Sequence, residues 1–392
     1  MRSTRKWFIV IIVAVVGLLL LAKTQSPTDR TDQAAEPTPG SIDATPMATP
    51  DSKPTQIPEA DLISAFTTVC ADNNVNSSDD QWPQADLTAR RYAYDEIQAK
   101  TSDRLSSSSN PEHLHVAALL EEYPPARIAL LDRAISQDSS DAFLLWSAVR
   151  ICSELDDRAD CRLEEWQQRL IEIDGQNSES WVRVATNRYA AGDKAGALEA
   201  MQHASTAAES RIYWTEAVET LERGYAAATD LEFSQRALMA FGVAASQLPS
   251  FAPALNMCRE ESADNEVWAY TCLAYGELAE NLGKTEIGVS IGQSFQILAS
   301  EGLGDEQKAA TVRLRQDARR DEMINDISNR EYNAMIERVF FSDPTLFSAY
   351  LMAVRSDGEI EAQRNINSQI ERLLEQRPEL ACESLLPDAQ SP

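Results

Sequence analysis

Residues with the types and spacing of catalytic groups are few in this sequence. Gly288, Ser290 and Gly292 match the G-x-S-x-G pattern, which presents a nucleophilic serine for acyl transfer where a strand turns into a helix. Such a serine needs a histidine base later in the chain, and the last histidine is His203. The residues before Gly288 also favour a helix start. We therefore interpret these glycines as small residues at which helices pack.

The histidines and carboxylates give no clear site either. His113 and His115 are two residues apart, which on a helix places them on different faces, and His203 stands beside Ala204 in a packing pattern. Neither H-E-x-x-H nor the phosphate-binding G-x-x-x-x-G-K-[ST] motif occurs. Carboxylates are so abundant that no pair stands out as an acid and base. The sequence predicts no catalytic residue, no cofactor and no metal site.

The net charge of the chain narrows the class of molecule that it can be expected to bind. The chain has 35 Lys and Arg against 62 Asp and Glu, a net charge of −27. A nucleic-acid-binding surface needs a basic footprint, so nucleic acid is not an expected partner. The one basic cluster alternates with acidic residues, which is typical of a solvent-exposed helix face. A docking stripe for an acidic partner is the alternative interpretation of this cluster: Arg313, Arg315, Arg319 and Arg320.

Six cysteines lie beyond the N-terminal apolar segment, and an even number outside the cytosol suggests disulfide bonds. Two pairs flank expected helix–helix junctions, and a third would form only if the two ends of the folded region meet. The three predicted bonds are Cys152–Cys161, Cys258–Cys272 and Cys70–Cys382. Six buried, reduced thiols are the alternative, while the absence of a C-x-x-C spacing disfavours zinc.

The N-terminus has the features of a membrane anchor. Arg2, Arg5 and Lys6 precede an unbroken apolar run over residues 7–22. A helix over this run spans about 24 Å, close to the roughly 30 Å of a bilayer's hydrocarbon core. The preceding positive charges favour a cytoplasmic N-terminus and export of the remainder. We expect a single-pass protein of the bacterial inner membrane with a periplasmic C-terminal domain; signal cleavage to a soluble periplasmic protein is the alternative.

Composition divides the chain into segments. Residues 1–6 form the expected cytoplasmic tip and residues 7–22 the transmembrane signal anchor. Residues 23–60 are rich in proline and threonine, and they predict a disordered linker because they cannot bury enough apolar surface to offset their ordering entropy. Residues 61–387 predict one helical repeat domain, followed by a tail over 388–392.

From residue 61 onward, apolar residues recur at helical spacing. One example is the single apolar face formed by Tyr332, Met335, Ile336, Val339 and Phe340. Asn110 and Asp343 each precede a proline, as expected of residues that cap helix N-termini. Gly192, Gly283 and Gly358 stand where helices are expected to end. No alternating run is long enough for a sheet, so we expect an all-α fold.

The segment 178–211 carries the most specific pattern. Trp181 opens two amphipathic helices that a turn at Gly192 separates, with small residues that let the helices approach closely at Ala185, Ala197 and Ala204. This large/small pattern resembles the 34-residue tetratricopeptide (TPR) repeat, a helix–turn–helix unit. The pattern recurs more weakly over 142–173 and 275–295. The resemblance implies an α-solenoid of TPR-like helix hairpins, because one hairpin cannot bury its own apolar face.

TPR-like solenoids hold a peptide or a partner helix in a groove lined by the first helix of each pair. By this resemblance, the expected groove residues of the best repeat are Glu179, Val182, Arg183, Thr186 and Tyr189. The resemblance implies a non-catalytic, membrane-tethered scaffold or adaptor of the cell envelope, whose protein or peptide partner offers a basic or neutral segment. The alternative is a cell-envelope enzyme, for example a glycan-cleaving one, with a site in the helical superhelix.

Overall fold

The computed structural model describes residues 84–155, 161–327, 330–377 and 380. The chain divides after Gln81 into two units, and the first, Met1–Gln81, lies outside the described residues. The predicted transmembrane segment, linker and tail therefore lie outside them, as do Cys70 and Cys382. No helix within the described ranges combines the length and the apolar character needed to cross a bilayer.

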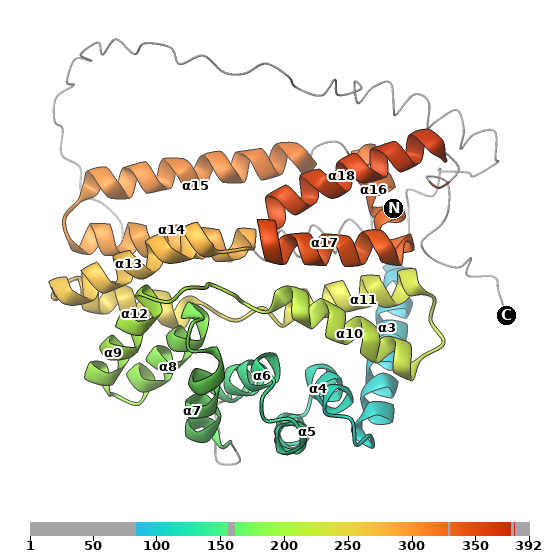
Figure 1. The fold of residues 1–392 in the computed structure, drawn as a ribbon, viewed down its shortest axis with the longest axis horizontal. Helices are drawn as coiled ribbons and strands as arrows, with labels where there is room; N and C mark the ends of the chain where they lie inside the picture. The colour runs from blue at the N-terminus through green and yellow to red at the C-terminus, as the bar shows by residue number, and fades with distance from the viewer. Residues whose placement is uncertain (1–83, 156–160, 328–329, 378–379, 381–392) are drawn as a thin grey trace, which may run out of the picture. The chain divides into compact units, whose positions relative to one another are not determined.

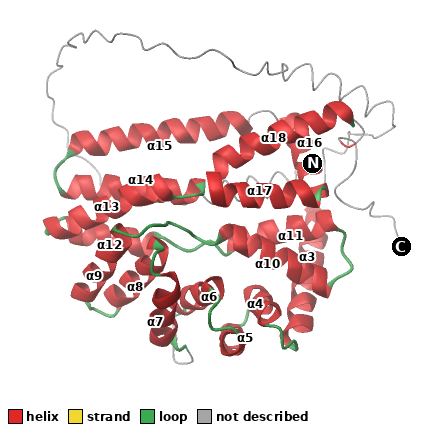
Figure 2. Cartoon of the chain, viewed as in Figure 1, coloured by secondary structure: helices red, strands yellow, loops and turns green. Residues whose placement is uncertain are grey.

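All regular secondary structure in these ranges is helical, and the all-α prediction is confirmed for them (Figure 2). The helices are α3 (Gln84–Ser106), α4 (Pro111–Leu120), α5 (Pro124–Gln137), α6 (Ala142–Ser153), α7 (Leu163–Asp174), α8 (Ser178–Ala190), α9 (Lys194–Ser205), α10 (Trp214–Ala228), α11 (Phe233–Ser246), α12 (Ala252–Ser262), α13 (Glu266–Leu282), α14 (Glu286–Gly302), α15 (Glu306–Ile327), α16 (Arg330–Ser342), α17 (Pro344–Asp357) and α18 (Glu359–Gln376).

Helix boundaries follow the capping residues found in the sequence. The side chain of Asn110 accepts a hydrogen bond from the backbone N–H of Glu112 at 2.9 Å, and Asp343 caps α17 in the same way. Gly192 and Gly358 adopt positive φ values of 84° and 92°, a region that glycine enters without steric cost. The predicted apolar face of α16 is buried at its four described side chains: Met335, Ile336, Val339 and Phe340.

Consecutive helices pack side by side as hairpins, α4 with α5, α6 with α7, and α8 with α9 (Figure 1). Later helices then pack back onto these hairpins. Helix α10 contacts α3 and α4, α12 contacts α8, and α13 contacts α9. In a simple repeat stack each unit contacts only its neighbours. Here the early hairpins are partly covered by helices that follow them in the chain.

Small residues set the closest helix contacts in the core. Ala185, Ala197 and Ala204 are fully buried between α8 and α9, as their spacing predicted. In the α13–α14 hairpin, the two helices cross at Gly276 and Gly292. A Cβ atom on Gly292 would lie 2.7 Å from the carbonyl oxygen of Gly276 and 2.5 Å from the backbone nitrogen of Glu280. The crossing therefore requires glycine.

Two disulfide bonds join neighbouring helical segments. Cys152 at the end of α6 bonds to Cys161 just before α7, with the Cα atoms 6.0 Å apart. Cys258 of α12 bonds to Cys272 of α13, with a Cα separation of 6.1 Å. Both pairings are the ones that the sequence predicted.

Candidate functional site

The five predicted groove residues lie along α8, and most of them are not accessible. Glu179, Val182 and Arg183 are 2%, 1% and 5% exposed, while Thr186 and Tyr189 are half-buried. In this structure the face is covered and does not line an open groove, and its part in binding a partner stays a prediction. The physical reason is that α12, the connection before it and α13 pack onto the same face of α8.

Glu179 is bound by side chains from two later segments. Its Oε1 atom accepts hydrogen bonds from the hydroxyl groups of Tyr275 at 2.7 Å and Ser210 at 3.4 Å. Burial raises the pKa of this carboxyl group, and the bond from Tyr275 and the charge of Arg183 oppose the rise. The other oxygen, Oε2, has no partner among the described residues. Glu179 thus fastens α8 to α13.

The C-terminal end of the same face binds α12. The hydroxyl oxygen of Tyr189 lies 2.7 Å from Oε1 of Glu261 and 2.9 Å from Oε2 of Glu260, so its one proton serves one carboxylate at a time. Lys194 forms an ion pair with Glu261 at 2.5 Å, and its Nζ atom lies 5.6 Å from the centre of the Tyr189 ring. These contacts anchor the end of α12 over the α8–α9 turn.

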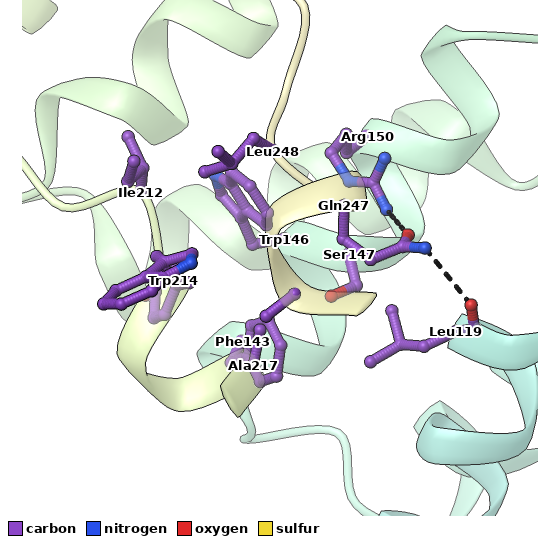
Figure 3. A pocket seen from close by; sticks show the side chains of 12 residues that line it. Leu119, Phe143, Trp146, Ser147, Arg150, Ile212, Trp214, Ala217, Gln247 and Leu248 are labelled. Atoms are coloured by element: carbon purple, nitrogen blue, oxygen red, sulfur yellow. Dashed lines mark hydrogen bonds between the residues drawn. The ribbon is translucent and has the colours of Figure 1, made fainter. Parts of the chain in front are cut away.

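Residues 247–251, which we call the connector, join α11 to α12 across this face. The side-chain amide of Gln247 is held on both sides. Its Oε1 atom accepts from Nη2 of Arg127 at 2.9 Å and from Nη2 of Arg150 at 2.6 Å. Its Nε2 atom donates to the carbonyl oxygen of Leu119 at 3.3 Å; the bonds to Arg150 and Leu119 are drawn in Figure 3. The connector is thus bound from α4, α5 and α6.

Arg183 of α8 holds the other end of the connector. Its Nη1 atom donates to the carbonyl oxygen of Ser250 at 3.3 Å. Its guanidinium carbon lies 5.6 Å from the ring centre of Phe251 and 6.0 Å from that of Trp146, within the range of cation–π attraction. We call the residues that bind the connector the inner face: Leu119, Arg127, Arg150 and Arg183.

Several donors of this region are buried without a partner among the described residues. They include Nε of Arg150 and both Nε and Nη2 of Arg183. Burial lowers the pKa of Arg150 to about 10, and the charge of Glu154, which pairs with it at 3.0 Å, opposes that effect. Burial also lowers the pKa of Arg183. The inner face therefore has hydrogen-bond donors that the connector does not bond, and the connector has no charged residue to pair with its arginines.

A small cavity lies beside the connector (Figure 3). Trp146, Ser147, Arg150 and Gln247 are among its lining residues. The space open to the centre of a water molecule is about 10 Å³, enough for roughly one water. Nε1 of Trp146 and Oγ of Ser147 have no protein partner in the described ranges. In this conformation the cavity admits water and nothing larger.

The histidines contribute to packing. His115 of α4 is buried with its ring centre 4.6 Å from that of Phe143; burial, and then the charge of Arg150, lower its pKa to about 3, so it stays neutral. His203 stacks on Trp181 at 4.3 Å, in the packing role that the sequence suggested. No three potential metal ligands come together in the part of the chain that the structure describes.

The other two chemical patterns of the sequence are also structural. Gly288, Ser290 and Gly292 lie inside α14 and not on a strand-to-helix turn. The basic cluster of α15 forms ion pairs within the chain, mostly with acids of α13 and α14, as expected of the solvent-exposed helix face. Its ion pairs are Arg313–Glu301, Arg315–Glu280 at 2.8 Å, Arg319–Glu286 at 2.5 Å and Arg320–Asp317 at 2.8 Å.

A second hollow, of about 400 Å³, opens to solvent between α7, α8 and α9. Trp181, His203 and Ile173 are among its lining residues, and Ile173 is 42% exposed. The indole N–H of Trp181 is already used, since it donates to the carbonyl oxygen of Gly175 at 2.8 Å. Unlike the inner face, this hollow shows no buried group without a partner in the described ranges that would specify a ligand.

Sequence reasoning missed Arg127, Arg150 and Gln247. One signal was present, because Arg150 is the only charged residue in the otherwise apolar helix α6. Arg150 and Arg183 also stand about one 34-residue repeat apart, as equivalent positions in successive repeats do. Nothing local in the sequence marks Gln247 as their partner.

No protein-family profile, curated protein sequence or solved structure matches this chain. The function of the inner face is therefore inferred from its own residues.

Proposed function

We propose that the protein is an exported, membrane-tethered scaffold of the cell envelope that binds a segment of a partner protein at the inner face. The observation that supports this proposal most is the way in which the inner face binds the connector. Arg127 and Arg150 bind one side chain, Arg183 binds one backbone carbonyl, and a ring lies against the same guanidinium. A surface that binds a non-helical segment in these three ways has the chemistry of a peptide-binding face.

The same proposal includes a TPR-like architecture for the hairpins from α6 to α9. Helices α6 and α7 match the weaker predicted repeat over 142–173, and α8 and α9 match the stronger one over 178–211. Trp181 lies between successive hairpins, with its indole N–H bonded to Gly175 at the α7–α8 turn. These features support a degenerate repeat whose first helices, α6 and α8, contribute Arg150 and Arg183 to the inner face.

The location follows from the N-terminal sequence and the cysteines. The apolar run over residues 7–22, preceded by positive charges, favours a signal anchor with the rest of the chain in the periplasm. The disulfides Cys152–Cys161 and Cys258–Cys272 are typical of an oxidising compartment. A soluble periplasmic form after signal cleavage has the same folded domain.

Photo-crosslinking in cells tests the binding surface. A photoreactive residue at Thr186 or Tyr189, the half-buried positions of α8 next to the inner face, should give a defined adduct with one partner protein. Met352 of α17 is 57% exposed and serves as the control position, from which no such adduct is expected. If Met352 gives the same adduct, or if both α8 positions give none, the assigned surface is wrong.

A further inference from the structure

We infer that the partner segment is acidic, in place of the basic or neutral segment that the sequence led us to expect, and that one of its carboxylates takes the place of the Gln247 amide between Arg127 and Arg150. The connector is then a built-in substitute that the partner displaces. This inference rests on the proposed function and adds the chemistry of the ligand to it.

The first support is a neutral group in a position suited to an anion. Oε1 of Gln247 accepts from two guanidinium groups, at 2.9 Å from Arg127 and 2.6 Å from Arg150. Glutamine and glutamate have nearly the same shape, so a carboxylate oxygen fits where this amide oxygen lies. With a carboxylate, each of these bonds also gains the attraction between opposite charges, which is stronger in a buried site than in water.

The second support is the set of unused donors. Arg150 is 3% exposed and Arg183 is 5% exposed, yet Nε of Arg150 and Nε and Nη2 of Arg183 bond to nothing in the described ranges. Buried donors in folded proteins are normally bonded. A segment with carboxylate oxygens can satisfy donors that the connector, with one amide oxygen and one carbonyl, leaves free.

The third support is the placement of the nearby acids. Glu154 pairs with Arg150 at 3.0 Å, and the charges of Glu154 and then Glu121 act on Arg127. Arg183 forms no close ion pair in the described part of the chain, although Glu179 and Glu154 act on it through their charges; the carboxylate of Glu179 bonds to Tyr275 and Ser210. The acids of the described ranges therefore leave the charge of Arg183 without a close partner.

The connector can detach from the inner face without breaking a series of backbone–backbone hydrogen bonds. Pro249 has no N–H, and the N–H of Leu248 bonds at 3.4 Å to Ala245 within its own turn. Among the described contacts, the connector's only main-chain bond to the inner face is the Ser250 carbonyl on Arg183. An incoming segment therefore replaces side-chain contacts and one carbonyl bond. The ligand expected from this geometry has Asp or Glu at one position and an aromatic residue four positions later.

Two labelled peptides test the inference. Both carry the sequence of residues 244–254, one unchanged and one with Gln247→Glu, and fluorescence anisotropy gives their Kd for the full-length protein. In the Gln247→Ala protein, whose own anchor is removed, the acidic peptide should bind at least about tenfold more tightly than the neutral one. The Gln247→Glu protein should bind the acidic peptide at least about tenfold more weakly than the Gln247→Ala protein, because its own carboxylate fills the position.

Equal Kd values for the two peptides, or no binding to a folded Gln247→Ala protein, would overturn the inference. Gln202→Ala, an exposed position on α9, is the matched control and should bind like the wild type. If Gln247→Ala does not fold, the melting temperature of Gln247→Glu decides: a rise supports a carboxylate site and a fall refutes it. A partner adduct from Thr186 together with equal Kd values for the two peptides would support the proposed scaffold function and refute only the preference for an acidic segment.

Discussion

Replacing Gly292 with alanine should destabilise the α13–α14 hairpin, whereas the same change at Gly288 should be tolerated. The added Cβ at 292 would lie 2.5 Å from the backbone nitrogen of Glu280 and 2.7 Å from the carbonyl oxygen of Gly276. Backbone atoms cannot rotate away, so the helices must move apart. Overpacking of this kind costs about 1–3 kcal/mol or more, while alanine gains about 1 kcal/mol over glycine in helix propensity. Because the contacts are with backbone atoms, we take the upper part of this range and expect a net loss of about 1–2 kcal/mol.

Gly288 provides the matched control in the same helix. A Cβ there would meet Oγ1 of Thr285 at 3.2 Å and no other side chain within 4 Å. A small movement of this hydroxyl relieves the contact, so we expect Gly288→Ala to lie within about 1 kcal/mol of the wild type.

Urea unfolding followed by circular dichroism measures both variants, with equal m-values as the sign that only stability has changed. If Gly292→Ala is as stable as Gly288→Ala, the helices do not cross as closely as described. The interpretation of Gly288, Ser290 and Gly292 as a packing pattern would then lose its main support.

Three further predictions concern covalent links, pH and buried charge. Loss of the disulfide in a Cys258→Ala/Cys272→Ala double variant should lower the free energy of unfolding by about 2–3 kcal/mol, measured by urea unfolding; no change would show that the bond is absent. Glu359 has its pKa raised to about 7, first by burial and also by the charge of Glu286, against a usual value of 4.5. Because the folded state binds this proton more tightly than the unfolded state, the stabilisation is complete below about pH 4.5 and is lost as pH rises through 7. Glu359→Gln should therefore be about 1–3 kcal/mol more stable than the wild type at pH 8 and similar to it near pH 4; equal stability at pH 8 would contradict the shift. Arg150→Met should destabilise the protein by about 1–3 kcal/mol, because it removes the bonds to the connector and to Glu154, and thermal melting should show a clear decrease in Tm.

Local features of the sequence predicted the helices and their ends. Asn110 and Asp343 cap helices because their side chains reach backbone N–H groups two or three residues later. Gly192 ends the α8–α9 turn because it alone among nearby residues adopts a positive φ without cost. Each of these effects lies within one helical turn of the residue that causes it, so a single sequence contains it.

The surroundings of the inner face could not be predicted in the same way. Helical periodicity puts Glu179 and Arg183 on one face of α8, but the burial of that face depends on α12, α13 and the connector, which lie about 60–100 residues further along the chain. The pairing of Gln247 with Arg127 and Arg150 is likewise a contact between distant segments. Periodicity specifies which face of a helix is covered and leaves open which segment covers it.

A single crosslinking measurement tests most directly whether the partner and the connector compete for the inner face. The yield of the partner adduct from a photoreactive residue at Thr186 is followed while the acidic peptide of residues 244–254, carrying Gln247→Glu, is added. If the partner and the connector share the inner face, the adduct decreases as the peptide concentration rises, and the unchanged peptide is a weaker competitor. An adduct whose yield is the same with and without the acidic peptide would contradict the claim that the partner and the connector share the inner face.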